Sequence, residues 1–115
     1  MTVYICQGRY TREAIAGMVD KPEDRAEAVA PLIKAAGAKL LDYYVTFGEY
    51  DWMVVIESGK DKSEIDTLAA LLAAAAGGGV TDLKTTVAVR SKDAVKAMRG
   101  ARKLVKSFKP AGQAA

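Results

Sequence analysis

The chain has 115 residues, of which 50% are apolar and 27% are charged, a composition typical of one globular domain. Its net charge is +3, and it has one cysteine and no histidine. An internal disulfide is therefore excluded, and the commonest general base and metal ligand are missing. No apolar run reaches the roughly 18 residues of a membrane span, and no secretory signal pattern opens the chain. We expect a cytoplasmic protein without a metal or cofactor.

Residues 2–8 are predicted to form the first strand, in which apolar residues lie on both faces. Tyr4 and Cys6 lie on one face, and Val3 and Ile5 lie on the other. Cys6 alternates with core residues, so we expect an inert buried thiol.

Two helices are expected next. Thr11 is a suitable N-cap for a short helix that continues to Met18. Pro22 is expected in the first turn of the second helix, which stops at Gly37. Pro31 lacks a backbone N–H and is expected to kink or tighten this helix.

Residues 39–57, KLLDYYVTFGEYDWMVVIE, predict a β-hairpin with its turn at residues 48–51. The second strand of the hairpin is apolar on both faces, with Trp52, Val54 and Ile56 on one face and Met53 and Val55 on the other.

The remaining pattern is a helix, capped by Ser63 or Asp61 and running to about Ala76, and then a last strand at residues 80–89. Glycines 77–79 follow the helix, and no Lys-Ser/Thr pair comes after them. They therefore indicate a helix stop and not a phosphate-binding loop.

The order of these elements predicts an α+β fold with the ferredoxin-like βαββαβ arrangement, an antiparallel sheet with helices on one face. Such a domain leaves the other sheet face wet, yet the hairpin strand is apolar on both sides. We therefore expect a second copy of the chain to cover that face, as in a dimeric α/β barrel. The domain is expected at residues 1–90, an added helix at residues 91–109, and a disordered tail at residues 110–115.

The basic residues gather in the last part of the chain. Residues 1–90 hold ten Lys and Arg against thirteen Asp and Glu, a net −3, whereas residues 91–115 hold seven against one, a net +6. Residues 91–109 predict a two-faced helix. Its apolar side would dock on the body or on a neighbouring subunit; contact of the basic side with an anionic membrane or with nucleic acid is a further alternative. The apolar side carries Ala94, Ala97, Met98, Ala101, Leu104, Val105 and Phe108, and the basic side Lys92, Lys96, Arg99, Lys103 and Lys106.

The turn Gly48-Glu49-Tyr50-Asp51, within YYVTFGEYDWMVVIE, resembles the glycine-tyrosine-aspartate pattern of the GYD domain family. The opening YICQGRYTREAIAGM and the later helix and strand are also similar, so the resemblance covers about residues 2–90. It implies an oligomeric ferredoxin-like barrel domain. It does not imply a particular activity, and the basic last helix and Pro31 are not carried over from the family.

The turn also holds the candidate site. One interpretation is structural, in which Asp51 caps the turn and Tyr50 packs on a neighbour. The other places Tyr50, Asp51 and Glu49 at the mouth of a cavity between sheet and helices. The further candidates for its walls are Tyr44, Tyr4, Trp52 and Arg9.

Three functions remain open. The first is an oligomeric module that binds or senses a small ligand. The second is a cofactor-free barrel enzyme, an isomerase or a monooxygenase-like protein, in which Asp51 or Tyr50 acts on the substrate. The third is an interaction protein that recruits a partner through its basic C-terminal helix. The sequence contains no catalytic motif that decides whether the protein is an enzyme.

Overall fold

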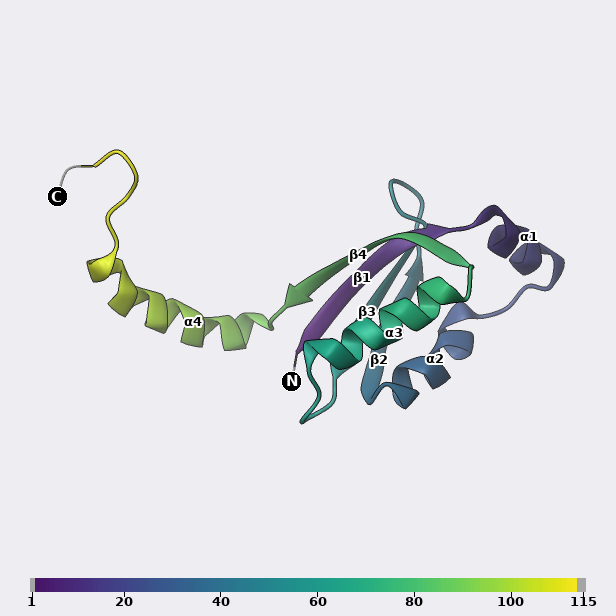
Figure 1. Cartoon of the computed structure of the whole chain (residues 1–115), viewed down its shortest axis with the longest axis horizontal. Helices are drawn as coiled ribbons and strands as arrows, with labels where there is room; N and C mark the ends of the chain where they lie inside the picture. The colour runs from purple at the N-terminus through teal and green to yellow at the C-terminus, as the bar shows by residue number, and fades with distance from the viewer. Residues whose placement is uncertain (1, 114–115) are drawn as a thin grey trace.

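The computed structural model describes residues 2–113 and has an α+β architecture. Within these residues, four strands form one antiparallel sheet and four α-helices accompany it (Figure 1). None of the described helices has the length and apolar character needed to span a membrane. In chain order the elements are β1 (Val3–Tyr10), α1 (Arg12–Asp20), α2 (Arg25–Ala35), β2 (Ala38–Val45), β3 (Trp52–Ser58), α3 (Glu64–Ala76), β4 (Val80–Ala88), α4 (Ser91–Leu104) and a 3₁₀ turn, η1 (Val105–Ser107).

The sheet has the strand order β2-β3-β1-β4, and each neighbouring pair is antiparallel. The two central strands, β1 and β3, are thus each paired on both sides. In their register Cys6 faces Val54 and Gly8 faces Trp52. Helices α2 and α3 lie over one face of the sheet (Figure 1). The predicted hairpin and antiparallel sheet are confirmed.

The core lies between this face and the two helices. Alternate residues of β1 and β3 are buried there, as their apolar pattern predicts. Gly8 is part of the arrangement because a Cβ at this position would stand 2.9 Å from Cε2 of the Trp52 indole and closer still to its Cζ2. The absence of a side chain therefore makes room for the indole ring. The buried apolar cluster consists of Tyr4, Cys6, Tyr10, Ile33, Trp52, Val54 and Ile56.

The other face of the sheet is open in the single chain. Val3 and Ile5 on β1 and Met53 and Val55 on β3 are only partly buried. On β2, Tyr44 stands opposite Met53 and is half exposed. This face is apolar at its centre, and no helix of the described chain covers it (Figure 1).

Side-chain caps fix where the helices begin. The Thr11 Oγ1 accepts from Ala14 N at 3.2 Å, which confirms the predicted cap of α1. The position expected for Pro22 is wrong: α2 begins after Asp24, whose Oδ1 accepts from Ala26 N at 2.9 Å. An aspartate supplies the acceptor that the first helical N–H groups need, so it sets the boundary more strongly than the proline does.

Helix α3 begins at the first of its two predicted caps. The Ser63 side chain accepts from Ile65 N, and the Asp66 carboxylate reaches back to Ser63 N at 2.9 Å. This reciprocal pair is a capping box. The contact with Ser63 N lowers the pKa of Asp66.

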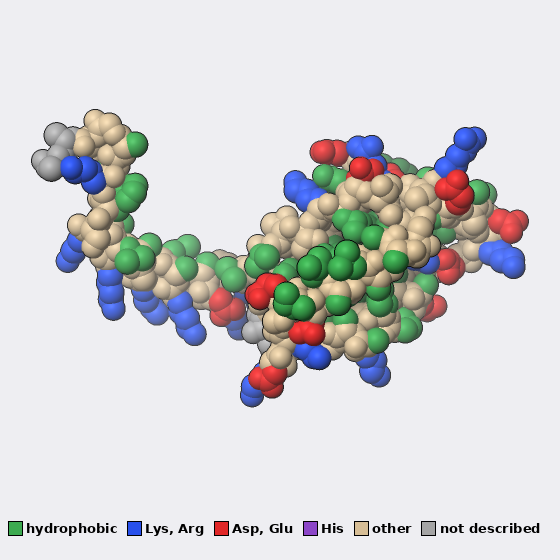
Figure 2. Space-filling view, in the orientation of Figure 1, with side chains coloured by type: hydrophobic (Ala, Val, Ile, Leu, Met, Phe, Trp, Pro, Cys, Tyr) green, Lys and Arg blue, Asp and Glu red, His purple; other side chains and the backbone are tan. Residues whose placement is uncertain are grey.

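Helix α4 projects away from the sheet instead of docking on the body of its own chain (Figure 1). It begins after Arg90, without a side-chain cap, and gives way to η1 at Val105, so Ser91 does not cap it and the regular helix is shorter than expected. Its apolar side is open to solvent: Met98 is 65% and Leu104 70% exposed. Figure 2 shows the Lys and Arg side chains along the opposite side. Of the predicted tail, residues 114–115 lie outside the described residues.

Substituting Gly8→Ala is expected to destabilise the fold by about 1–3 kcal/mol, because the new methyl group would force the buried indole out of its position. Chemical denaturation followed by circular dichroism measures the change. Gly17→Ala is the matched control, since open space surrounds that helical position. It should stabilise the protein by about 0.5–1 kcal/mol. Equal effects of the two substitutions would contradict this account of Gly8.

Candidate functional site

The loop between β2 and β3 is tied to the end of β1. Asp51 N donates to Gly8 O at 2.8 Å, and its Oδ2 accepts from Tyr10 N at 3.0 Å. The Arg9 Nε donates to Glu49 O at 2.9 Å. These three bonds join segments about forty residues apart in the chain.

The loop also closes on itself. Thr46 N donates to Asp51 O at 2.8 Å, and the Thr46 hydroxyl donates to Tyr50 O at 2.6 Å. The prediction that Asp51 caps its own turn is wrong, because its carboxylate accepts from Tyr10 N. The carboxylate accepts from a neighbouring strand and not from its own turn, so it holds β1 against the start of β3.

A cavity of about 290 Å³ lies between the sheet and helices α2 and α3. Its walls are largely apolar, and its floor is the buried face of β1 and β3. The residues that line it are Cys6, Arg25, Ala28, Val29, Leu32, Ile33, Tyr43, Trp52, Val54, Ile56, Thr67, Ala70, Leu71, Ala74, Gly77, Gly79 and Val80.

Two donors in this wall have no hydrogen-bond partner in the described structure. The Nε1 of Trp52 is buried, and the residue as a whole is only 6% exposed. The Nε of Arg25 is also buried, although the rest of its side chain reaches solvent. A buried donor without an acceptor costs about 1–3 kcal/mol. Both nitrogens are shielded from the cavity space by neighbouring atoms, so the polar groups that Arg25 and Tyr43 bring to the wall are the rest of the guanidinium and the phenol.

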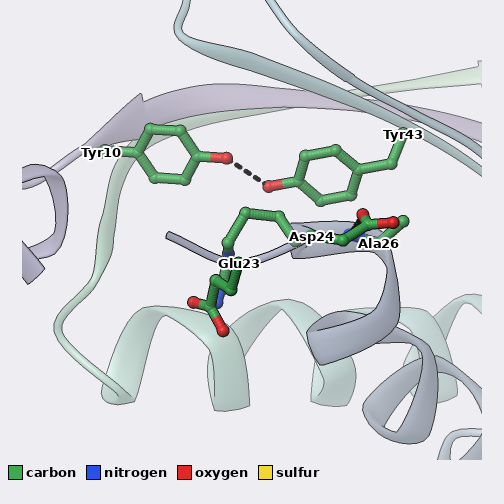
Figure 3. A network of polar contacts seen from close by, with 6 residues as sticks. Tyr10, Glu23, Asp24, Ala26 and Tyr43 are labelled. Atoms are coloured by element: carbon green, nitrogen blue, oxygen red, sulfur yellow. Dashed lines mark hydrogen bonds and ion pairs between the residues drawn. The ribbon is translucent and has the colours of Figure 1, made fainter. Parts of the chain in front are cut away.

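A tyrosine pair adjoins Arg25. The Tyr10 and Tyr43 hydroxyls share a hydrogen bond of 2.5 Å, and Figure 3 shows the two rings end to end above the start of α2. Burial, and then the contact with Tyr43, raises the pKa of Tyr10 well above its ordinary value. Burial would lower the pKa of Arg25, but contacts with Glu23 and Tyr43 raise it. Arg25 is therefore a cation and Tyr10 a neutral phenol at physiological pH.

Cys6 lies in the cavity wall and fits the prediction of a buried thiol. Burial raises the pKa of Cys6, and the Thr85 hydroxyl, 3.8 Å from its sulfur, only partly offsets this. The thiol form is weakly nucleophilic. Among residues 2–113, no three His, Cys, Asp or Glu side chains are grouped where they could hold a metal ion.

The structure separates the sequence-based candidates into four places. Arg9, Glu49, Tyr50 and Asp51 meet at the loop, whereas Trp52 is the candidate that lines the cavity. The two other candidates lie elsewhere: Tyr4 is buried in the core cluster, and Tyr44 is half exposed on the open sheet face.

Sequence reasoning missed Arg25, Tyr10 and Tyr43. One signal was available: Tyr43 stands opposite Val54 in the hairpin, so strand alternation places it on the helix side and Tyr44 on the other. The place of Arg25 depends on how α2 lies over the sheet, which no local pattern records.

The GYD domain family model matches residues 4–98. The chain therefore belongs to the GYD domain family, as the turn between β2 and β3 had indicated. Comparison of the sequence with curated proteins gives no match.

Three solved structures are similar to this chain. The crystal structure of FFRP-DM1 is 17% identical with a TM-score of 0.45, and the match covers 77% of this chain and 100% of that one. Hypothetical protein PHS023 from Pyrococcus horikoshii is 17% identical with a TM-score of 0.45, covering 79% and 93%. TTHA0845 from Thermus thermophilus is 20% identical with a TM-score of 0.47, covering 79% and 96%.

Substituting Asp51→Ala is expected to lower the free energy of unfolding by about 1–3 kcal/mol, because Tyr10 N loses its acceptor. Asp51→Asn should cost less, since its amide oxygen can still accept. Glu49→Ala is the control. The exposed Glu49 accepts the hydrogen bond from Arg9 through its main-chain carbonyl, which the substitution keeps, so the free energy of unfolding should change by no more than about 0.5 kcal/mol. Urea denaturation measures all three, and an Asp51→Ala protein as stable as the wild type would contradict the structural role.

Proposed function

We propose that this GYD domain protein is an oligomeric module that binds a small ligand in the cavity between the sheet and helices α2 and α3. The observation that carries the proposal is a cavity of about 290 Å³ whose wall is largely apolar and holds few polar side chains, among them Arg25, Tyr43 and Thr67. Ligand sites are concave and mostly apolar, with few polar groups that orient the ligand. The volume is at the lower end for such sites, which favours a small ligand.

Binding is better supported than catalysis by Asp51 or Tyr50. Neither side chain lines the cavity, and one oxygen of Asp51 is engaged by Tyr10 N. A base must reach the proton that it removes. The cavity wall instead presents donors, an unreactive thiol and apolar groups, which suit the retention of a ligand.

The oligomeric part of the proposal rests on the open face of the sheet. The strand order β2-β3-β1-β4 is that expected of a ferredoxin-like domain. Apolar residues at the centre of β1 and β3 are partly exposed on this face in the single chain. A second copy packed sheet to sheet would remove them from water and complete a dimeric barrel.

The surface of helix α4 also favours a second copy of the chain as the partner. Its apolar side is exposed, and residues 91–115 carry a net +6 against −3 for residues 1–90. A tail that crosses to a neighbouring copy would therefore bury apolar surface and meet a body of opposite charge. Contact of the basic side with nucleic acid or with an anionic membrane stays a prediction.

Ligand uptake can be followed through Trp52, which is the single tryptophan of the chain and lines the cavity. We expect at least one of four probes, octanoate, octanol, phenylacetate and 2-phenylethanol, to change its fluorescence in a saturable way. Ala74→Leu should weaken this binding at least tenfold, because the longer side chain occupies part of the cavity.

Ala73→Leu is the matched control for that experiment. Ala73 is the exposed neighbour of Ala74 on α3 and does not line the cavity, so binding should be unchanged. No saturable response of the wild-type protein to any of the four probes would refute the proposed binding function.

Light scattering at micromolar concentration tests the assembly. The wild-type protein is expected to have the mass of at least two chains. Val55→Glu should reduce the mass to that of one chain, because packing two sheets together would bury the new carboxylate without an opposite charge to pair with it. Val19→Glu is the control, since Val19 is 75% exposed and belongs to α1 and not to the sheet. A wild-type mass equal to one chain would refute self-association.

A further inference from the structure

Helix α3 is apolar on two opposite sides. Its polar residues are Glu64, Asp66 and Thr67, and all its others are apolar. The inner side, which includes Ala70 and Ala74, lines the cavity. A helix that is apolar all round is typical of one with neighbours on both sides. At about 100° per residue, the side opposite to the cavity carries a stripe, here called the outer stripe, of Ile65, Leu68, Ala69, Leu72 and Ala76.

The outer stripe is open to solvent in the single chain. All of its members are exposed, Ile65 at 73% and Leu72 at 61%. Figure 2 shows hydrophobic side chains gathered along α3 on this side of the molecule. We infer that the outer stripe is the docking site for the apolar side of α4 from a second copy of the chain. This inference rests on the proposed self-association and adds the surfaces that meet.

The two helices match in length and in shape. Helix α3 has 13 residues and α4 has 14, so each is about 20 Å long. The outer stripe presents large side chains such as Leu68 and Leu72, whereas the apolar side of α4 sets small residues such as Ala101 between Met98 and Leu104. Small residues opposite large ones let two helices pack with their axes about 8–10 Å apart.

The charges of the two helices also complement each other. Residues 64–76 hold two acidic residues and no basic one, a net −2, whereas residues 91–104 hold five basic residues against one acidic, a net +4. Opposite charges favour the encounter of these two surfaces, and they disfavour the pairing of α4 with another α4. The basic side of α4 lies opposite to its apolar side, so its lysines stay in solvent when the apolar side docks.

The base of α4 is held away from the α3 of its own chain. Arg90 immediately precedes α4, and its Nη1 binds Glu57 Oε2 at 2.6 Å. Glu57 alternates with the buried residues of β3 and belongs with Met53 and Val55 to the open face of the sheet. This ion pair therefore fixes α4 on the side of the sheet opposite to α3. Since α4 then extends away from the body (Figure 1), the α3 that it meets belongs to another copy.

The outer stripe and the open sheet face lie on opposite sides of the chain, so one copy can use both. Two copies that exchange their α4 helices around a twofold axis, combined with sheet pairing, form a tetramer of two sheet-paired dimers. Four α4 helices then join the two dimers, whereas only two would join two single chains. Because binding is much weaker with fewer linked sites, Val55→Glu is still expected to leave single chains.

Light scattering of the full chain at micromolar concentration tests this assembly. The wild-type protein is expected to have the mass of four chains. Leu72→Glu on α3 and Leu104→Glu on α4 should each reduce the mass to two chains, because the contact would bury an unpaired carboxylate. Both residues are exposed in the single chain, so its fold should be kept. Lys96→Glu is the matched control: it lies on the basic side of α4, and the mass should stay at four chains.

A second measurement detects the contact directly. A nitroxide label is attached to Met98→Cys, since the native Cys6 is buried. This protein is mixed with nitrogen-15-labelled wild-type protein and left to exchange subunits. The amide signals of residues 65–76 should broaden, because only a nitroxide on another copy can affect the nitrogen-15 chain. Leu72→Glu in the nitrogen-15 chain should abolish this broadening.

The outcomes separate this inference from the proposed function. A wild-type mass of two chains, a mass of four that survives Leu72→Glu or Leu104→Glu, or no broadening of residues 65–76 would overturn the contact between α4 and α3 and leave the sheet-paired dimer standing. A mass of two chains together with binding to phosphatidylserine vesicles would assign the apolar side of α4 to a membrane surface instead. A mass of one chain would overturn both the inference and the proposed self-association.

Discussion

The fit of the Trp52 indole against Gly8 is the contact on which the rest of the domain depends. The two residues are cross-strand neighbours on the central strands, and a side chain at Gly8 would occupy the space of the ring. With this ring in place, the buried face of β3 can pack against α2 and α3. The same residue lines the cavity between the sheet and helices α2 and α3. One packing arrangement therefore stabilises the sheet and forms part of the cavity wall.

The turn that gives the family its pattern supports this arrangement from outside the cavity. Asp51 immediately precedes Trp52 and is bonded through its main-chain N–H and its carboxylate to the end of β1. Arg9 adds a bond to the same loop. These contacts hold β1 and β3 in register beside the indole. The loop therefore positions the wall of the cavity, although the side chains of the loop do not line the cavity.

The sheet separates two activities that the proposals assign to this chain. Its helix side carries the cavity, and its open side carries the apolar surface that a second copy would cover. Strand alternation makes this possible, because successive side chains of β3 point to opposite faces. Val54 belongs to the cavity wall and Val55 to the open face. Assembly and ligand binding can therefore be changed independently by substitutions one residue apart.

The sequence by itself determined the order of the elements, the antiparallel sheet, the alternation of β1 and β3 and the family. These follow from periodicities of two and 3.6 residues and from local caps, which neighbouring residues encode. Only the tertiary structure decided that Asp51 bonds to Tyr10 N, that Arg25 reaches the wall beside Tyr43, and that α4 leaves the body. Each depends on how segments far apart in the chain lie against one another. Such an arrangement is set by packing and by the space between elements, and no local pattern of residues contains it.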